Sequence, residues 1–234
     1  MGLTGIFPID RWNFDTKAAL DRLSEADFLH LSKNRSTQRY EKGDIIFRER
    51  AVPSGVFIIR IGKVKKYKVD VSGKEQVIYI AGEGELIGYH AVLSNDRYPD
   101  SAAALENAVL DFIPKEDFMD TLQRSPLFAR LLLKAMSREF SVLTNSISVL
   151  AHRSASERLA IALIILREKY KPQGPHNESV INISRTDLAN IAGVAKENVI
   201  RLLKEFKSAD VLQTHGRKIW IKDIHALIER TNYR

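Results

Sequence analysis

The chain of 234 residues contains no cysteine. Disulfides, thiolate metal sites, cysteine-ligated iron–sulfur clusters and cysteine nucleophiles are therefore excluded. A long apolar run is also missing, because the longest, Leu159 to Leu166, is far shorter than the roughly 20 residues of a membrane span. The N-terminal segment has no basic region followed by an apolar core, so we expect no export signal. Together these absences favour a cytoplasmic protein that makes no membrane contact.

Motifs of the common enzyme classes are missing as well. The chain has no Gly-Lys-Ser or Gly-Lys-Thr phosphate loop, and the glycine pair Gly82 and Gly84 does not open a helix. Serine, histidine and aspartate residues occur, but none lies in a nucleophile elbow or a zinc motif. We therefore predict no metal site and no catalytic residue, and an enzyme is the least favoured of three functional hypotheses.

Positive charge is concentrated in the last third of the chain. Residues 152–234 hold 15 Lys and Arg against 9 Asp and Glu, whereas residues 1–151 hold 21 against 20. A basic segment of this kind suits a polyanionic partner, because each neutralised phosphate releases counterions. A solvated basic surface without a partner is the alternative that charge alone leaves open.

The first half of the chain combines a helical segment with many short strands. Residues 15–32 show helical spacing of leucines, and Ser24 with Asp27 can cap a turn. From Tyr40 onward, β-branched runs alternate with glycines, which predicts an antiparallel sandwich or barrel. The expected strands cover residues 44–47, 56–61, 64–71 and 76–80, with a hairpin turn at 71–74 and a last pair within 101–113.

Pro114 opens a helical region with a regular apolar seam. From Ala129 onward, apolar residues recur at alternating steps of 4 and 3, as in a coiled-coil heptad. The seam continues through Leu133, Met136, Phe140, Leu143, Ile147 and Leu150. A second apolar face is expected at Leu127, Leu131, Leu132, Val142 and Val149. Because both faces must be covered, we expect one to pack on the β domain and the other on a partner helix in a homodimer. Burial of both faces within one chain is the alternative.

The segment that follows has the pattern of two further helices and a hairpin. His152 to Ser154 interrupt the long helix, Ser154 and Glu157 form a capping box, and the new helix ends near Tyr170, before a polar loop at 171–178.

Residues 183–206 then read as a short helix, a tight turn at Gly193 and a second helix over 195–207. Ser184 with Asp187 forms a capping box, and Leu188 and Ile191 are expected to be buried. On the second helix Val199, Leu202, Leu203 and Phe206 face inward, and Lys196, Glu197, Asn198, Ile200 and Arg201 face outward. Residues 211–221 form a hairpin that turns at His215 and Gly216.

This arrangement is typical of a helix-turn-helix followed by a wing. The start of the second helix enters the major groove in such a unit. Lys and Arg donate to guanine, and Glu accepts from cytosine. The hairpin tip presents His215, Arg217 and Lys218, which suits contact with a phosphate backbone. A helical subdomain with an ordinary charged face is the alternative.

Residues 183–221 resemble the winged helix of the bacterial family of the cyclic-AMP receptor protein and the fumarate–nitrate reduction regulator (CRP/FNR). The resemblance extends to Tyr40-Glu-Lys-Gly-Asp and Gly84-Glu-Leu-Ile-Gly88 in the β region and to residues 127–151. It implies an α+β fold: an N-terminal antiparallel, cyclic-nucleotide-binding-like β-roll (a jelly roll), a long dimerisation helix and a C-terminal winged helix-turn-helix. The corresponding domains are 1–126, 127–151 and 152–234.

The resemblance also assigns residues to DNA. The family's recognition helix typically starts Ser-Arg-Glu-Thr-Val-x-Arg, and residues 195–201 here read Ala-Lys-Glu-Asn-Val-Ile-Arg. By that match Lys196, Glu197 and Arg201 read bases, while Ser184, Arg185 and Asn198 hold phosphates. Lys196 stands where Arg is usual and lacks the fork that binds guanine through two hydrogen bonds.

The family's cyclic-nucleotide pocket is altered in this chain. Tyr89, after Gly88, replaces the Glu that binds the ribose, and Asp100-Ser101 replaces the Arg-Ser pair that binds the cyclic phosphate. Only Arg97 is expected to lie near enough to offset the Asp100 carboxylate. Thr144, with Leu143, matches the positions that meet the base. We therefore expect no binding of cyclic AMP in the usual manner; no cofactor is identified, and the effector, if one exists, is another small molecule. His90 beside this pocket raises haem as a ligand, but a surface or hydrogen-bonded histidine is the favoured interpretation.

The leading hypothesis is a homodimeric transcription regulator that binds a pseudo-palindromic operator in double-stranded DNA. The resemblance implies RNA polymerase as a further partner. The second hypothesis is a small-molecule or nucleotide sensor whose C-terminal domain makes protein contacts. In the leading hypothesis an effector shifts the population of dimer states through the hinge at 152–154.

Overall fold

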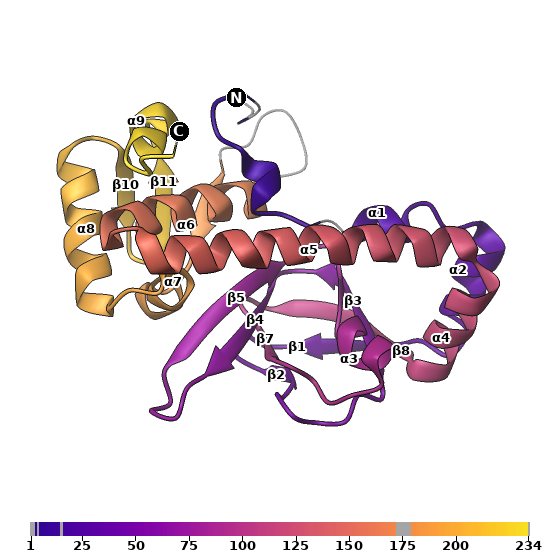
Figure 1. Ribbon diagram of the computed structural model, residues 1–234. Helices are drawn as coiled ribbons and strands as arrows, with labels where there is room; N and C mark the ends of the chain where they lie inside the picture. Colours follow the sequence, from indigo (N-terminus) through magenta and orange to yellow (C-terminus); the bar gives the residue numbers. More distant parts are fainter. Residues whose placement is uncertain (1–2, 4, 15, 172–178, 234) are drawn as a thin grey trace. The chain divides into compact units, whose positions relative to one another are not determined.

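The computed structural model describes residues 3, 5–14, 16–171 and 179–233. It divides into two compact units, one formed by Asn13–Lys74 and Ile78–Ser141 and the other by Met1–Trp12, Glu75–Val77 and Val142–Arg234. The loop predicted at 171–178 lies, except for Lys171, outside the described residues. The order of the elements along the chain can be followed in Figure 1.

The first of these units contains two antiparallel sheets, as the short glycine-bounded strands predict. One sheet has the order β1-β8-β3-β6, and the other has the order β2-β7-β4-β5. The strands are β1 (Ser36–Tyr40), β2 (Ile45–Phe47), β3 (Gly55–Ile61), β4 (Val64–Val69), β5 (Glu75–Ala81), β6 (Leu86–Ile87), β7 (Ser101–Ala104) and β8 (Ala108–Pro114). The sequence pattern misses β1 and β6, and it extends β4 by two residues.

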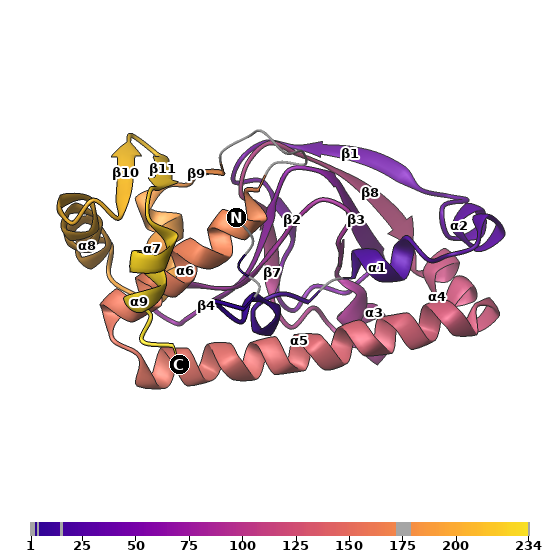
Figure 2. The same ribbon diagram turned by 90° about the horizontal axis from the view of Figure 1, so that it is seen from above.

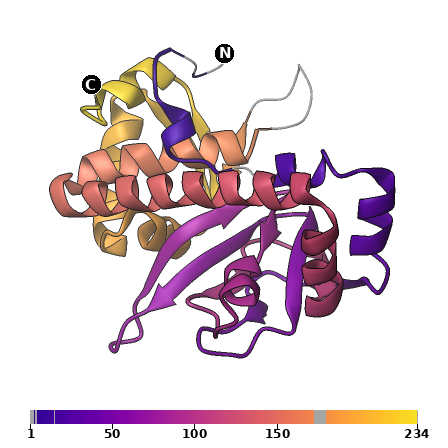
Figure 3. The same cartoon turned by 45° about the vertical axis from the view of Figure 1, so that its right-hand side comes forward.

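The turn between β4 and β5 is built around Asp70. The Asp70 carboxylate accepts hydrogen bonds from the amides of Ser72 (2.8 Å) and Lys74 (3.0 Å), and Gly73 supplies the positive φ of 81°. This hairpin is seen at the lower left of Figure 3. The turn predicted at 71–74 is therefore confirmed, with Asp70 as its organising residue.

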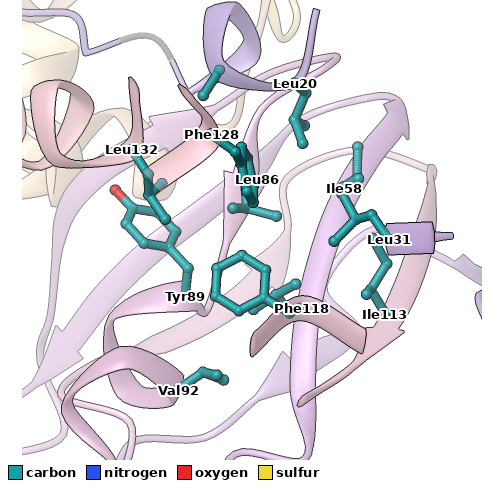
Figure 4. Packing of buried hydrophobic residues seen from close by; sticks show 12 residues of the cluster. Leu20, Leu31, Ile58, Leu86, Tyr89, Val92, Ile113, Phe118, Phe128 and Leu132 are labelled. Atoms are coloured by element: carbon teal, nitrogen blue, oxygen red, sulfur yellow. The ribbon is translucent and has the colours of Figure 1, made fainter. Parts of the chain in front are cut away.

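Helices cover the sheet to which β3 and β8 belong. Helices α1 (Lys17–Leu20), α2 (Glu25–Leu31), α3 (Tyr89–Ser94), α4 (Lys115–Arg124) and the long α5 (Pro126–His152) surround a common apolar core. Figure 4 shows Phe118 and Phe128 packed in this core with Leu86 and Tyr89. Residues 15–32, expected to be helical, form two helices, because the chain turns after Leu20. The predicted cap is confirmed: Ser24, with extended backbone, accepts from the Asp27 amide at the start of α2.

Helix α5 is continuous over 27 residues (Figure 2). Its buried positions are Phe128, Leu132, Ala135, Glu139 and Val142, again at steps of 4 and 3. Leu132 and Val142 belong to the second face predicted from the sequence. Leu127 does not, because its side chain is 42% exposed while the adjacent Phe128 is buried. Leu131 and Val149 are half-buried.

The other unit holds the C-terminal helices and a three-stranded antiparallel sheet of order β10-β11-β9. Its elements after α5 are α6 (Ala155–Lys169), β9 (Val180–Asn182), α7 (Arg185–Ala192), α8 (Lys196–Ser208), β10 (Leu212–His215), β11 (Lys218–Ile221) and α9 (Ile224–Glu229); η1 (Ile9–Arg11) lies near the N-terminus. The break at 152–154 is confirmed, because Ser154 and Glu157 form a complete capping box at the start of α6. Strand β9 was not predicted.

Candidate functional site

The start of α7 is fixed by Ser184. Its hydroxyl oxygen accepts from the Asp187 amide at 2.9 Å and donates to the Asp187 carboxylate at 2.6 Å. Leu188 is fully buried beneath this turn, whereas Ile191 is only half-buried. The predicted helix start at Ser184 is therefore confirmed, and the helix is anchored mainly through Leu188.

Gly193 ends α7 and makes the tight turn into α8. Its φ of 64° is left-handed, and a Cβ atom here would lie 2.6 Å from the Leu150 Cδ2 atom. The left-handed conformation therefore favours glycine, and a Cβ atom would require the Leu150 side chain to shift. Ala195, in extended conformation, precedes the first residue of α8, Lys196. This geometry is the helix-turn-helix that the sequence predicts.

Helix α8 separates an apolar face from a polar one. Val199, Leu202, Leu203 and Phe206 are buried, as predicted. Lys196, Glu197, Asn198, Ile200 and Arg201 are exposed. The Arg201 guanidinium makes a long ion pair, of 3.7 Å, with Glu205, and both side chains are more than half exposed. The first two turns of α8 therefore present two cations, one carboxylate and one amide to an approaching partner.

The hairpin of β10 and β11 forms the predicted wing. His215, Arg217 and Lys218 are exposed at its tip, and Gly216 has a φ of 56°. Arg185, at the start of α7, is half-buried and donates from Nη2 to the Gly216 carbonyl at 2.9 Å. Burial lowers the pKa of this guanidinium. Arg185 therefore holds the wing turn in place, a role that the sequence did not predict. The sequence predicted only a contact with DNA phosphate for this residue.

The five residues predicted for the effector pocket lie on several elements: Gly88 and Tyr89 at the start of α3, Arg97 in the segment that follows it, Ser101 on β7 and Thr144 on α5. Tyr89 is buried behind Gly88, which has a φ of 81°, and Ser101 accepts a hydrogen bond from the Glu49 amide at 2.9 Å. Arg97 is exposed and donates to the Arg50 carbonyl at 2.9 Å. Thr144 is exposed on α5 and belongs to the other unit. The effector pocket therefore stays a prediction from the sequence.

The Tyr89 hydroxyl belongs to a buried ionic cluster with His90, Lys66, Asp100 and Glu139. The Tyr89 hydroxyl donates to Glu139 of α5 over 2.5 Å, and His90 Nε2 lies 2.6 Å from the same carboxylate. Lys66 Nζ is 3.2 Å from Glu139 and 3.3 Å from Asp100. The expectation that only Arg97 can offset Asp100 is therefore wrong, because Lys66, inward-facing on β4, neutralises this carboxylate.

The contacts in this cluster shift the pKa values of Glu139 and Lys66 in the directions that favour their charged forms. Burial alone would raise the pKa of Glu139, but the hydrogen bond from His90 and the charge of Lys66 lower it to about 2. Burial acts to lower the pKa of Lys66, and the charges of Glu139 and Asp100 more than compensate, so that its pKa is raised. Burial and the Glu139 charge raise the pKa of Tyr89 well above its usual value. The low pKa of Glu139 and the raised pKa of Lys66 therefore keep these two groups charged at neutral pH, beside the neutral phenol of Tyr89.

The described residues contain no cluster of metal ligands. No group of three or more His, Asp or Glu side chains there is arranged to hold a metal ion. His90, the residue that raised haem as a possibility, has its Nε2 atom engaged with Glu139. No described helix is long and apolar enough to cross a membrane.

Comparison with known proteins covers both units. Residues 37–125 match the family described as Cyclic nucleotide-binding domain, and residues 157–230 match the Crp-like helix-turn-helix domain. The anaerobic regulatory protein of Haemophilus influenzae is 30% identical over 192 residues, which cover 82% of this chain and 74% of that protein. The chain belongs to the CRP/FNR family of transcription regulators. The family resemblance seen in the sequence, the α+β fold class and the expectation of a regulator rather than an enzyme are thereby confirmed.

Other relatives agree with this assignment. The fumarate and nitrate reduction regulatory protein of Vibrio cholerae is 29% identical over 190 residues, covering 81% of this chain and 76% of that protein. Among solved structures, FixK2 of Bradyrhizobium japonicum superimposes with a TM-score of 0.75 at 20% identity, covering 83% of this chain and 96% of that chain. The regulator CLP of Xanthomonas campestris gives a TM-score of 0.71 at 20% identity, covering 85% and 99%. At these identities the two structures support the fold alone.

Proposed function

We propose that this CRP/FNR-family regulator binds double-stranded DNA sequence-specifically as a homodimer, with the start of α8 in the major groove. The observation that carries the proposal is the arrangement of Lys196, Glu197 and Arg201. All three are exposed on the first two turns of a helix whose opposite face is buried by Val199 and Phe206. Because the buried face fixes the rotation of the helix, the three side chains point together toward the partner.

The surrounding residues supply the phosphate contacts in this proposal. Ser184 and Asn198 lie at the starts of α7 and α8, where helix N-termini attract phosphate groups. His215, Arg217 and Lys218 at the wing tip contact the backbone beside the groove. Arg185 contributes partly by holding the wing turn through the Gly216 carbonyl.

The exposed apolar seam of α5 supports the homodimer. Leu133 is 66% exposed, Phe140 73% and Ile147 68%. Met136 and Leu143 are half-buried, and Leu150 is 38% exposed. Three large apolar side chains at heptad spacing are costly to leave in water, and a second copy of the same helix covers them. Two recognition helices about one helical turn of DNA apart, roughly 34 Å, then read a pseudo-palindromic operator.

The proposed domains remain 1–126, 127–151 and 152–234, with the hinge at 152–154. In this proposal RNA polymerase is the further partner through which the bound dimer acts. Cyclic AMP is not the effector in the usual manner, since Tyr89 and Asp100 face Glu139 and Lys66 rather than an open pocket. Calorimetry with cyclic AMP and cyclic GMP tests this part, and binding tighter than about 100 μM, a free energy of about −5.5 kcal/mol, contradicts it.

Selection from a pool of random DNA duplexes tests the main proposal. We expect enrichment of a two-fold symmetric motif whose half-sites are about 10 base pairs apart, centre to centre. Mapping of bound sites in the source genome then yields the operator and the target genes. If the protein enriches no motif and its duplex binding does not weaken with salt, the sensor whose C-terminal domain contacts proteins becomes the better hypothesis.

A further inference from the structure

Three hydrogen-bond donors, one on β4 and two on α3, converge on one carboxylate of α5. The Tyr89 hydroxyl and His90 Nε2 come from α3, and Lys66 Nζ comes from β4; all three lie within 3.2 Å of a Glu139 oxygen. Tyr89 is 1% exposed, Lys66 6% and Glu139 4%, so water cannot replace the bonds from Tyr89 and Lys66, whereas the His90 side chain is 27% exposed. Buried donors left without an acceptor are costly, and a buried charge left alone is costlier still.

The donor set has the composition of an anion site. It contains a fixed ammonium group, a phenol and an imidazole nitrogen, and the acceptor that it surrounds is a carboxylate on a different element. Asp100 lies 3.3 Å from the same Lys66 Nζ atom, so this ammonium group is shared between two carboxylates. Because Glu139 is on α5, this single side chain joins the long helix to β4 and α3.

We propose that Lys66, Tyr89 and His90 form a carboxylate-binding site whose ligand is Glu139 of the same chain, a built-in substitute for a small-molecule effector. The site holds α5 against β4 and α3 with no small molecule bound. Resting on the proposed function, this predicts that the purified protein binds its operator without any effector. The contacts to Glu139 then fix the position of α5, and no bound small molecule is needed for this.

Chemical rescue tests the carboxylate site directly. The variant Glu139→Ala removes a group the size of acetate, and its unfolding temperature should fall on the order of 10 °C, as expected for a broken buried ion pair. Sodium acetate should restore several degrees of this loss, whereas sodium chloride at the same ionic strength should not. Glu116→Ala, at an exposed position on α4, is the matched control and should respond equally to both salts. An equal response of Glu139→Ala to the two salts overturns the proposal.

A milder variant and a DNA-binding measurement complete the test. Tyr89→Phe keeps the buried ring and removes only the donor to Glu139, so it should fold and weaken operator binding by about tenfold, within the usual range of coupling between sites. The wild-type protein, unfolded, dialysed free of small molecules and refolded, should bind the operator without any additive.

The results of these experiments distinguish a failure of the proposed DNA binding from a failure of the proposed carboxylate site. If neither the wild-type protein nor any variant prefers one duplex over another, the proposed function fails, while the acetate rescue still decides the carboxylate site. If the refolded wild-type protein binds the operator only after a small molecule is added, or if Tyr89→Phe binds as tightly as wild type, the substitute-effector role fails and DNA binding stands.

Discussion

Arg185, at the first position of α7, donates from its guanidinium to the Gly216 carbonyl at the wing tip, 2.9 Å away. This hydrogen bond ties the helix-turn-helix to the wing across 31 residues of sequence. Within the described part of the chain the buried Nη1 atom of Arg185 has no hydrogen-bond partner. The guanidinium therefore makes a structural bond to the wing, while a second of its donors is buried.

Arg185→Ala should loosen the wing. We expect the unfolding temperature to fall by about 3 °C, because one hydrogen bond from a charged, half-buried donor is lost. Binding to all duplexes should weaken, with the order of preference among sequences unchanged. Differential scanning calorimetry and competition binding check the two effects. An unchanged unfolding temperature together with weaker binding would show that Arg185 contacts phosphate without holding the wing.

Lys218→Ala should change the salt dependence of DNA binding. Lys218 is exposed at the start of β11, next to the wing turn, and a phosphate contact there contributes charge but no sequence information. The slope of log affinity against log salt should fall by about one unit, equally for operator and random duplexes. Lys33→Ala, an exposed lysine of the other unit and outside the proposed interface, is the control. A loss confined to the operator would assign Lys218 to base recognition.

Ile147→Asp should dissociate the dimer. Ile147 is 68% exposed in the seam of α5, so the carboxylate costs little in the monomer but faces its own copy in the dimer. Sedimentation equilibrium should show monomers at concentrations where the wild-type protein is dimeric. Ser148→Asp, exposed at the next position but outside the seam, should remain dimeric. If both variants are dimeric, the seam is not the dimer interface.

Stability should depend on pH through Glu139. Its pKa in the folded protein, about 2, is below the ordinary value of 4.5, so its stabilisation is present above about pH 4.5 and is lost as the pH falls through about 2. The difference corresponds to about 3 kcal/mol. Urea unfolding between pH 5 and pH 2, a range set by this pKa shift, should show a smaller decline in the free energy of unfolding for Glu139→Gln than for wild type. Parallel declines would contradict the coupling of Glu139 to Lys66 and His90.

Local patterns were enough to predict the helix-turn-helix. The spacing of Val199, Leu202 and Phe206 fixes which side of α8 is buried, and Gly193 fixes the turn, since only glycine suits its conformation. These features involve residues close in sequence. Strand β1 escaped prediction for the opposite reason. Its five residues, Ser36–Tyr40, are mostly polar and exposed, and it exists through backbone pairing with β8, about 70 residues later.

The ionic cluster escaped prediction because it depends on distant partners. Glu139 and Lys66 are 73 residues apart, and each looks like an ordinary exposed charge in its own segment. A signal was present in α5, where Glu139 continues the row of Phe128, Leu132 and Ala135 at helical spacing. A carboxylate in an apolar row indicates a buried charge that needs a partner, but the sequence does not identify which cation supplies it.

The most direct test of the account is the binding of Arg201→Ala to the selected operator and to a scrambled duplex. Arg201 is exposed, and its ion pair with Glu205 adds at most about 0.5 kcal/mol to stability, so the variant should fold normally. We predict that operator affinity falls by about 1–3 kcal/mol per half-site, while binding to the scrambled duplex changes little. Lys207→Ala, in the last turn of α8, should retain its preference for the operator. An Arg201→Ala protein that still discriminates between the two duplexes as well as wild type would contradict base reading by α8.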